Sequence, residues 1–201
     1  MRITKIIAII ILLTLTSCGV DNHIFQKEKF DELQLLKIST VTKLENKAHS
    51  RDITPNHLIG IGTGIYPNPK NYILATPKTF KTKELPNFQL ETQYFYSAND
   101  SLVKVILYQW DYLEKKEIDF PEAENLTNKF KVFQIKFNRL KDKLTKNLGQ
   151  PIEINIEQNK TSDSAFRDGI KWKNNSGLKA YLFMFGNNNG YRQIRLAIYK
   201  D

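Results

Sequence analysis

The most regular hydrophobic pattern in the chain lies between residues 121 and 148. Large apolar residues recur there at intervals of three and four, which places them along one side of a helix with 3.6 residues per turn. Glycine is favoured just after a helix end and proline prevents continuation, and Gly149 and Pro151 follow this segment. The apolar positions are Leu126, Phe130, Phe133, Phe137, Leu140, Leu144 and Leu148. We therefore predict one long amphipathic helix over about residues 121–148.

Segments rich in aromatic and β-branched residues predict strands on both sides of this helix. Residues 93–96 and 102–108 flank a polar turn, and residues 152–157 alternate strictly, as expected of a half-buried strand. Further strands are predicted at residues 169–173, 178–185 and 191–199, the last two joined by a hairpin turn at Gly186-Asn187-Asn188-Asn189-Gly190. The segment 178–185 is almost entirely apolar, which indicates a central strand covered on both sides, or a strand with one side facing a partner.

The N-terminal third of the chain is less regular. Residues 26–37 predict a short helix, whereas five prolines between residues 53 and 87 argue against long elements there. Short strands are expected at residues 58–61, 72–75 and 88–96. The fold class predicted from these patterns is α+β: an antiparallel β-sheet packed by one long amphipathic helix, with a shorter N-terminal helix.

The first residues have the pattern of an export signal. Arg2 and Lys5 precede an apolar run from Ile6 to Leu15, which is shorter than the roughly 20 residues of a membrane-spanning helix. The segment Leu15-Thr16-Ser17-Cys18 that follows resembles the lipobox of bacterial lipoproteins. This resemblance implies cleavage before Cys18, a diacylglyceryl group on its thiol and acylation of the new N-terminus.

The same resemblance divides the chain into three parts. Residues 1–17 would be a lipoprotein signal peptide, residues 18–24 the lipidated Cys18 with a short tether, and residues 25–201 a single α+β domain. The predicted location is the cell envelope, anchored to a membrane through Cys18. Gly19 stands where aspartate favours inner-membrane retention in lipoproteins of the enteric type, so the outer membrane is favoured.

Composition limits the classes of partner. Cys18 is the only cysteine, so the chain contains no intramolecular disulfide. The formal net charge is +9, but lysines outnumber arginines by 24 to 6. Phosphate-reading sites favour the arginine fork over the lysine point charge, so a nucleic-acid partner is not expected. A basic domain is also compatible with a position close to anionic lipids.

Candidate chemistry is sparse. His49 and His57 could converge on a metal ion with Asp52, but surface loop histidines are the commoner arrangement. The run 60–64, Gly-Ile-Gly-Thr-Gly, lacks the helix start of a dinucleotide-binding fingerprint and the Lys-Ser/Thr of a P-loop. Carboxylates gather before and at the start of the long helix, where solvated helix-capping charges are expected, at Glu114, Glu117, Asp119, Glu122 and Glu124.

Two further patterns suggest surface roles. Basic residues flank the apolar stripe of the long helix, where we expect them to be solvent-exposed: Lys129, Lys131, Lys136, Arg139, Lys141, Lys143 and Lys146. The alternative is a polyanion-binding surface, to which Tyr191-Arg192 and Arg195 could add. The triplets Asp100-Ser101-Leu102 and Asp163-Ser164-Ala165 resemble acceptor sites of a bacterial O-glycosylation system.

These observations predict no catalytic residues, no cofactor and no metal site. The expected function is that of a membrane-anchored envelope lipoprotein acting as a non-enzymatic protein-binding module, either an assembly accessory or an immunity-type inhibitor. The alternatives left open are an envelope enzyme acting on glycans, and a binder of polyanions or lipid headgroups.

Overall fold

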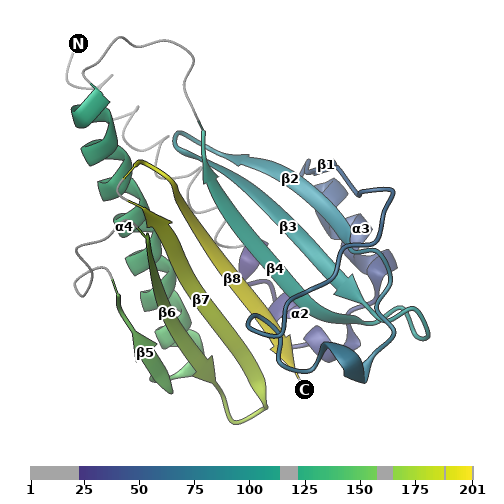
Figure 1. Cartoon of the computed structure of the whole chain (residues 1–201). Coiled ribbons are helices and arrows are strands. Elements are labelled where there is room, and N and C mark those ends of the chain that lie inside the picture. The colour runs from purple at the N-terminus through teal and green to yellow at the C-terminus, as the bar shows by residue number, and fades with distance from the viewer. Residues whose placement is uncertain (1–22, 114–121, 158–164, 188, 201) are drawn as a thin grey trace, which may run out of the picture.

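Two antiparallel meanders join into one sheet of eight strands (Figure 1). The computed structural model describes residues 23–113, 122–157, 165–187 and 189–200. Within them the strand order is β1-β2-β3-β4-β8-β7-β6-β5, so the C-terminal strand β8 lies in the middle against β4. The bounds are β1 (Arg51–Asp52), β2 (Lys78–Glu84), β3 (Phe88–Tyr96), β4 (Val103–Tyr112), β5 (Glu153–Asn155), β6 (Ala165–Lys173), β7 (Leu178–Asn187) and β8 (Arg192–Lys200).

The long helix is confirmed as α4 (Glu122–Leu148). It packs against β6, β7 and β8, and it lies behind these strands in Figure 1. Phe133, Phe137, Leu140 and Leu144 on its apolar stripe are buried. The helix ends as predicted, because Gly149 adopts a φ of 88° and its N–H donates to the carbonyl of Thr145. The predicted α+β architecture, an antiparallel sheet packed by one long helix, is therefore confirmed.

The N-terminal helix differs from the prediction. Residues 26–37 form only one helical turn, α2 (Lys27–Phe30), and a 3₁₀ turn, η1 (Leu33–Leu35). The chain then pairs with the β3–β4 turn, where the N–H of Val103 donates to the carbonyl of Leu36. This contact interrupts the helix. A second helix, α3 (Ile38–Lys47), follows it and was not predicted from the sequence.

The proline-rich region also departs from expectation. Residues 58–61 form no strand, and residues 72–75 contribute a single bridge between Leu74 and Ser97. A 3₁₀ turn, η2 (Pro69–Asn71), precedes that bridge, and β1 and β2 are strands that the sequence patterns did not predict. Residues 88–96 do form a strand, β3, and the strand–turn–strand unit with β4 is confirmed.

The second meander matches its predictions except at the edge of the sheet. The hairpin between β7 and β8 is confirmed, and β7 is an interior strand between β8 and β6. The prediction of a half-buried strand at residues 152–157 is wrong, because only β5 forms and all three of its residues are exposed. Ile154 alternates as a buried position should, yet it is 62% exposed because β5 lies at the edge of the sheet.

The two faces of the sheet are covered differently. Face one carries the main core beneath α4, α2, η1 and α3. Face two, on the opposite side, is crossed by the loop between β1 and β2, residues 53–77, which runs in front of the sheet in Figure 1. Tyr66 of this loop is fully buried against Tyr199, with ring centroids 5.3 Å apart. The loop covers only part of face two, so the remainder of that face is available for contacts.

Candidate binding patch on face two of the sheet

Strand register places a row of side chains across face two. In this row Lys81 pairs with Glu91, Glu91 with Gln109 and Gln109 with Arg195. Arg195 then pairs with Phe183 on β7. The face therefore changes from charged and amide side chains over β2–β4 to aromatic and arginine side chains over β6–β8.

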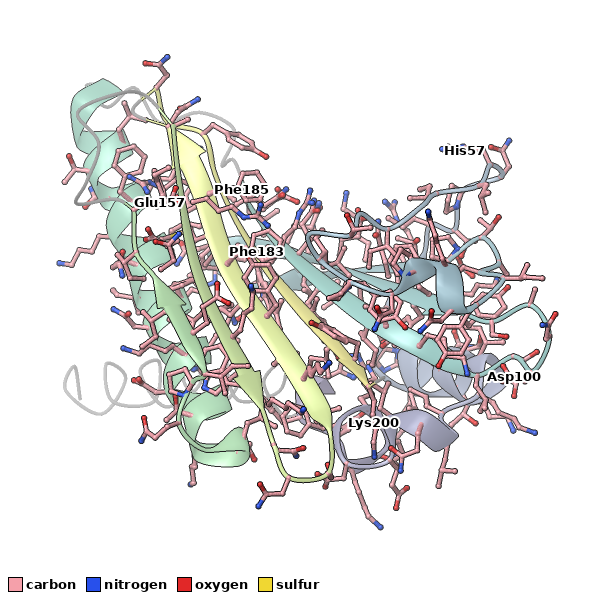
Figure 2. All side chains as sticks on the ribbon, turned by 60° about the horizontal axis from the view of Figure 1, so that its bottom comes forward. His57, Asp100, Glu157, Phe183, Phe185 and Lys200 are labelled. Carbon is pink, nitrogen blue, oxygen red and sulfur yellow. The ribbon has the colours of Figure 1, made fainter. Side chains whose placement is uncertain are left out.

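The aromatic part of the row lies on β7. Alternation sends Leu182 and Met184 into the core beneath α4, and it sends Phe183 and Phe185 to face two. The two phenylalanine rings are stacked, with centroids 6.0 Å apart and an interplanar angle of 24°. Figure 2 shows both side chains on β7, on the side of the sheet away from α4. Phe185 is half-buried and therefore partly available at the surface.

Two arginines lie over these rings from the neighbouring strands. The guanidinium carbon of Arg167 is 4.7 Å from the ring centroid of Phe183, and that of Arg195 is 5.2 Å from the ring centroid of Phe185. Such cation–π contacts contribute about 0.5–1 kcal/mol each at exposed sites. We call Arg167, Phe183, Phe185 and Arg195 the Arg–Phe patch. Tyr191, which is 49% exposed, extends it with a ring contact of 5.8 Å to Phe185.

A hydrogen-bonded chain orients Arg195. Its Nε donates to Oε1 of Gln193 at 2.7 Å, and Nε2 of Gln193 donates to Oδ1 of Asp111 at 2.6 Å. Nε2 of Gln109 donates to the other carboxylate oxygen of Asp111 at 2.9 Å. Burial lowers the pKa of Arg195, while the nearby charges of Asp111 and Glu91 oppose this effect. In this chain Arg195 donates through Nε alone, so its two terminal nitrogens take no part in it.

Neither arginine of the patch has a carboxylate partner in the described part of the chain. The ion pairs found there involve other cations, and neither Arg167 nor Arg195 belongs to one. Glu157 lies nearby, but its carboxylate accepts from the main-chain N–H of Arg167, at 2.9 Å, rather than from the guanidinium. The patch thus presents two arginines on an aromatic floor without an internal counterion among the described residues.

The strongest charge cluster lies on face one and is fully enclosed. Lys29 and Glu45 are buried, Nζ of Lys29 donates to Oε1 of Glu45 at 2.7 Å, and Nε2 of His23 lies 2.8 Å from the same oxygen. The hydroxyl of Tyr94 also donates to that oxygen. Burial alone would raise the pKa of Glu45, but the hydrogen bond from His23 and the charge of Lys29 hold that pKa well below its usual range. Burial lowers the pKa of Lys29 from 10.5 to about 8. Because these groups are enclosed, the cluster joins the N-terminal segment to β3 rather than forming an accessible site.

A second buried ion pair corrects one prediction for α4. Lys136 was expected to be solvent-exposed, but it is 5% exposed and its Nζ donates to Oε1 of Glu84 at 2.5 Å. Nε1 of Trp110 donates to the other oxygen of Glu84 at 2.7 Å. The pair lines a hollow of about 270 Å³ between the β2–β3 turn and α4. Lys136 is buried because β2, which the sequence patterns did not predict, brings a carboxylate opposite it.

The other candidate residues from the sequence are not brought together. His49 follows the C-cap of α3 with a φ of 55°, and Nδ1 of His57 lies in the loop on face two, 3.4 Å from the side-chain oxygen of Asn56. Within residues 23–113, 122–157, 165–187 and 189–200, no three histidine, cysteine, aspartate or glutamate side chains are grouped to hold a metal ion. A Cβ added at Gly60, Gly62 or Gly64 would meet nothing within 4 Å, so these glycines are not required for close packing.

Several predicted features fall outside the described residues. Cys18, the signal peptide, Glu114, Glu117 and Asp119 lie there, as do Asp163 and Ser164 of the second glycosylation-like triplet. The side chains of Glu122 and Glu124 are also not described. In the first triplet Ser101 is exposed in the β3–β4 turn, and the neighbouring Asp100 lies at the outer tip of that turn in Figure 2.

Comparisons with known proteins give no relative. No family model matches the chain, and neither a curated protein nor a solved structure is similar to it. In the described part of the structure, no helix is long and apolar enough to span a membrane. What is established is therefore the class of fold, an α+β protein whose antiparallel sheet is packed by one long helix on face one and partly covered by a loop on face two.

Proposed function

We propose that the protein is a lipid-anchored protein of the cell envelope that binds a protein partner through the Arg–Phe patch. The anchor rests on the lipobox-like segment ending at Cys18. The binding function rests on the patch, where arginines stack on phenylalanines on face two of the sheet. Arginine and aromatic residues are enriched among the residues that contribute most to protein–protein binding. No catalytic group is assigned in this proposal, and an enzyme acting on glycans stays an untested alternative.

The lipid anchor is tested with Cys18→Ala in the native bacterium. We expect this variant to lose incorporation of an alkyne-labelled fatty acid and to leave the membrane fraction. Ser17→Ala is the matched control, because a small residue before the cysteine is retained and lipidation should continue. Equal fatty-acid labelling of Cys18→Ala and the unaltered protein would refute the anchor.

The binding surface is tested by placing a photo-crosslinking amino acid at Tyr191, beside the patch. We expect one defined crosslinked species in living cells. The same amino acid at Lys131, which is exposed on α4 across the sheet, should not give that species. Loss of the crosslink in Phe185→Ala, which removes a ring of the patch that Tyr191 contacts, would tie it to the patch. A species captured equally from both positions would contradict the proposed surface.

A further inference from the structure

We infer that Arg167 and Arg195 together bind carboxylates, so that the partner presents an acidic segment to face two. This inference rests on the proposed binding function and specifies the chemistry of the partner. Strand register and side-chain direction together place both guanidinium groups over the rings on β7.

The two arginines converge on β7 from opposite sides. Arg167 on β6 is paired with Phe185, yet its guanidinium lies over Phe183. Arg195 on β8 is paired with Phe183, yet its guanidinium lies over Phe185. Each side chain therefore crosses diagonally to the ring in the neighbouring row. This arrangement holds two guanidinium groups over a single stacked pair of rings.

Neither guanidinium in this arrangement forms an ion pair with a carboxylate of the described residues. Burial lowers the pKa of Arg195, the nearby charges of Asp111 and Glu91 oppose this effect, and the charge of Arg167 adds a smaller lowering. The acids that act on Arg195 accept hydrogen bonds from amide side chains: Asp111 accepts from Gln109 and Gln193, and Oε1 of Glu91 accepts from Gln93 at 2.8 Å. An external carboxylate would therefore pair with the two guanidinium groups without displacing these bonds.

The guanidinium geometry favours carboxylates as that anion. Each arginine can offer two parallel N–H donors to one carboxylate, and Arg195 is oriented for this because its Nε is held by Gln193. Phe183 is 2% exposed, so the partly exposed ring of Phe185, together with Tyr191, can at the same time contact the apolar parts of an extended chain. Both properties fit an acidic protein segment laid across β7.

The position of the N-terminus favours a protein over a lipid headgroup. His23 and Ile24, the first described residues, pack on face one, His23 against Glu45 and Ile24 in the core beneath the helices. The tether from Cys18 would be five residues long and would span at most about 18 Å. The anchored membrane therefore lies nearer to face one, and the Arg–Phe patch lies on the opposite face of the sheet.

The test uses the full-length lipidated protein in a neutral detergent and a fluorescein-labelled peptide of ten glutamates as the probe. We expect the anisotropy titration to show binding that weakens about tenfold or more in Arg167→Gln/Arg195→Gln, because hydrogen bonds to charged groups are lost. Lys131→Gln/Lys146→Gln removes the same charge from exposed positions of α4 and should change affinity less than about twofold. Arg167→Lys/Arg195→Lys retains the charge without the fork and should be intermediate.

Several results would overturn the inference. An equal loss of peptide affinity in Arg167→Gln/Arg195→Gln and Lys131→Gln/Lys146→Gln would indicate non-specific attraction. Unchanged affinity of Arg167→Lys/Arg195→Lys would show that the guanidinium fork is not required. Displacement of the peptide by inorganic phosphate at concentrations where glutarate has no effect would indicate a phosphate site instead. A Tyr191 crosslink that persists in Arg167→Gln/Arg195→Gln would refute the acidic segment and leave the proposed function standing. Arginine-dependent peptide binding without any crosslinked partner would refute the proposed function alone.

Discussion

Lys29 Nζ lies 2.7 Å from Glu45 Oε1, and both side chains are shielded from solvent, with exposures of 0% and 1%. Lys29 belongs to α2 and Glu45 to α3, while the hydroxyl of Tyr94 on β3 bonds to the same carboxylate. Desolvation makes a buried ion pair a poor source of net stability, but loss of one partner leaves an uncompensated buried charge. The pair therefore makes the packing of the N-terminal segment on the sheet specific.

Removing the ammonium group alone should be strongly destabilising. We expect Lys29→Met to lower the free energy of unfolding by about 3 kcal/mol or more, because the carboxylate of Glu45 remains buried. The double variant Lys29→Met/Glu45→Leu should lose less than the sum of the single variants. Urea unfolding followed by circular dichroism measures both effects. Lys27→Met, in which an exposed ion pair with Glu32 is lost, is the control and should change stability little. Additive losses in the double variant would contradict this account.

The same carboxylate should make the protein sensitive to acid. The pKa of Glu45 is held below its usual value of 4.5 in the folded protein, so folding favours the deprotonated form. The associated stability is present above pH 4.5 and is lost as the pH falls below that value toward the folded pKa. We expect the melting temperature of the wild-type protein to fall more steeply below that pH than the melting temperature of Glu45→Gln. Parallel curves for the two proteins would show that Glu45 does not carry this dependence.

The sequence predicted the parts of the fold in which local pattern and tertiary packing agree. For α4, the apolar stripe and the end at Gly149 both appear in the residues themselves. By contrast, four of the first five residues of α3 are β-branched and the other is Ser39, so this segment has weak helix propensity and its packing on face one outweighs local preference. The strand β2 was not predicted for a related reason. Its sequence is mostly polar, and its strand conformation is stabilised by pairing with β3 rather than by its own composition.

The Arg–Phe patch could be anticipated only in part. The apolar run around Phe183 and Phe185 indicated a strand with two covered sides or one side facing a partner, and β7 has one side beneath α4 and the other only partly covered by the loop. The roles of Arg167 and Arg195 depend on the register of three strands and on diagonal side-chain directions. Neither property is encoded in residue spacing along one segment, which explains why the arginine pair was not predicted.

The two tryptophans offer a direct test of the second buried ion pair. Nε1–H of Trp110 donates to Glu84, whereas Nε1 of Trp172 is buried without a hydrogen-bond partner among the described residues. In Glu84→Gln we expect the indole proton resonance of Trp110 to move upfield, because a neutral amide replaces a carboxylate acceptor. The resonance of Trp172 should remain in place and serves as the internal reference. We also expect a loss of about 2–3 kcal/mol in stability, because Lys136 keeps its buried charge. An unchanged Trp110 resonance would contradict the hydrogen bond.

A glycine in the β7–β8 hairpin links the fold to the proposed surface. A Cβ at Gly186 would lie 2.4 Å from the carbonyl oxygen of Tyr191, a backbone atom that cannot move without shifting the hairpin. We expect Gly186→Ala to cost about 1–3 kcal/mol in stability, as overpacking does elsewhere. Because the shift displaces Tyr191 and the adjoining Phe185, affinity for the ten-glutamate peptide should also fall.

The matched control is Gly62→Ala in the loop on face two. An added Cβ there meets no atom within 4 Å, and Gly62 is not among the glycines with positive φ. Since alanine also restricts the unfolded chain, this variant should be neutral or stabilised by up to about 1 kcal/mol. Gly186→Ala should be less stable than Gly62→Ala in chemical unfolding, and it should bind the ten-glutamate peptide more weakly in the anisotropy titration. If Gly186→Ala retained full stability while losing peptide binding, the link between hairpin packing and the patch would be wrong, because the two properties would have changed independently.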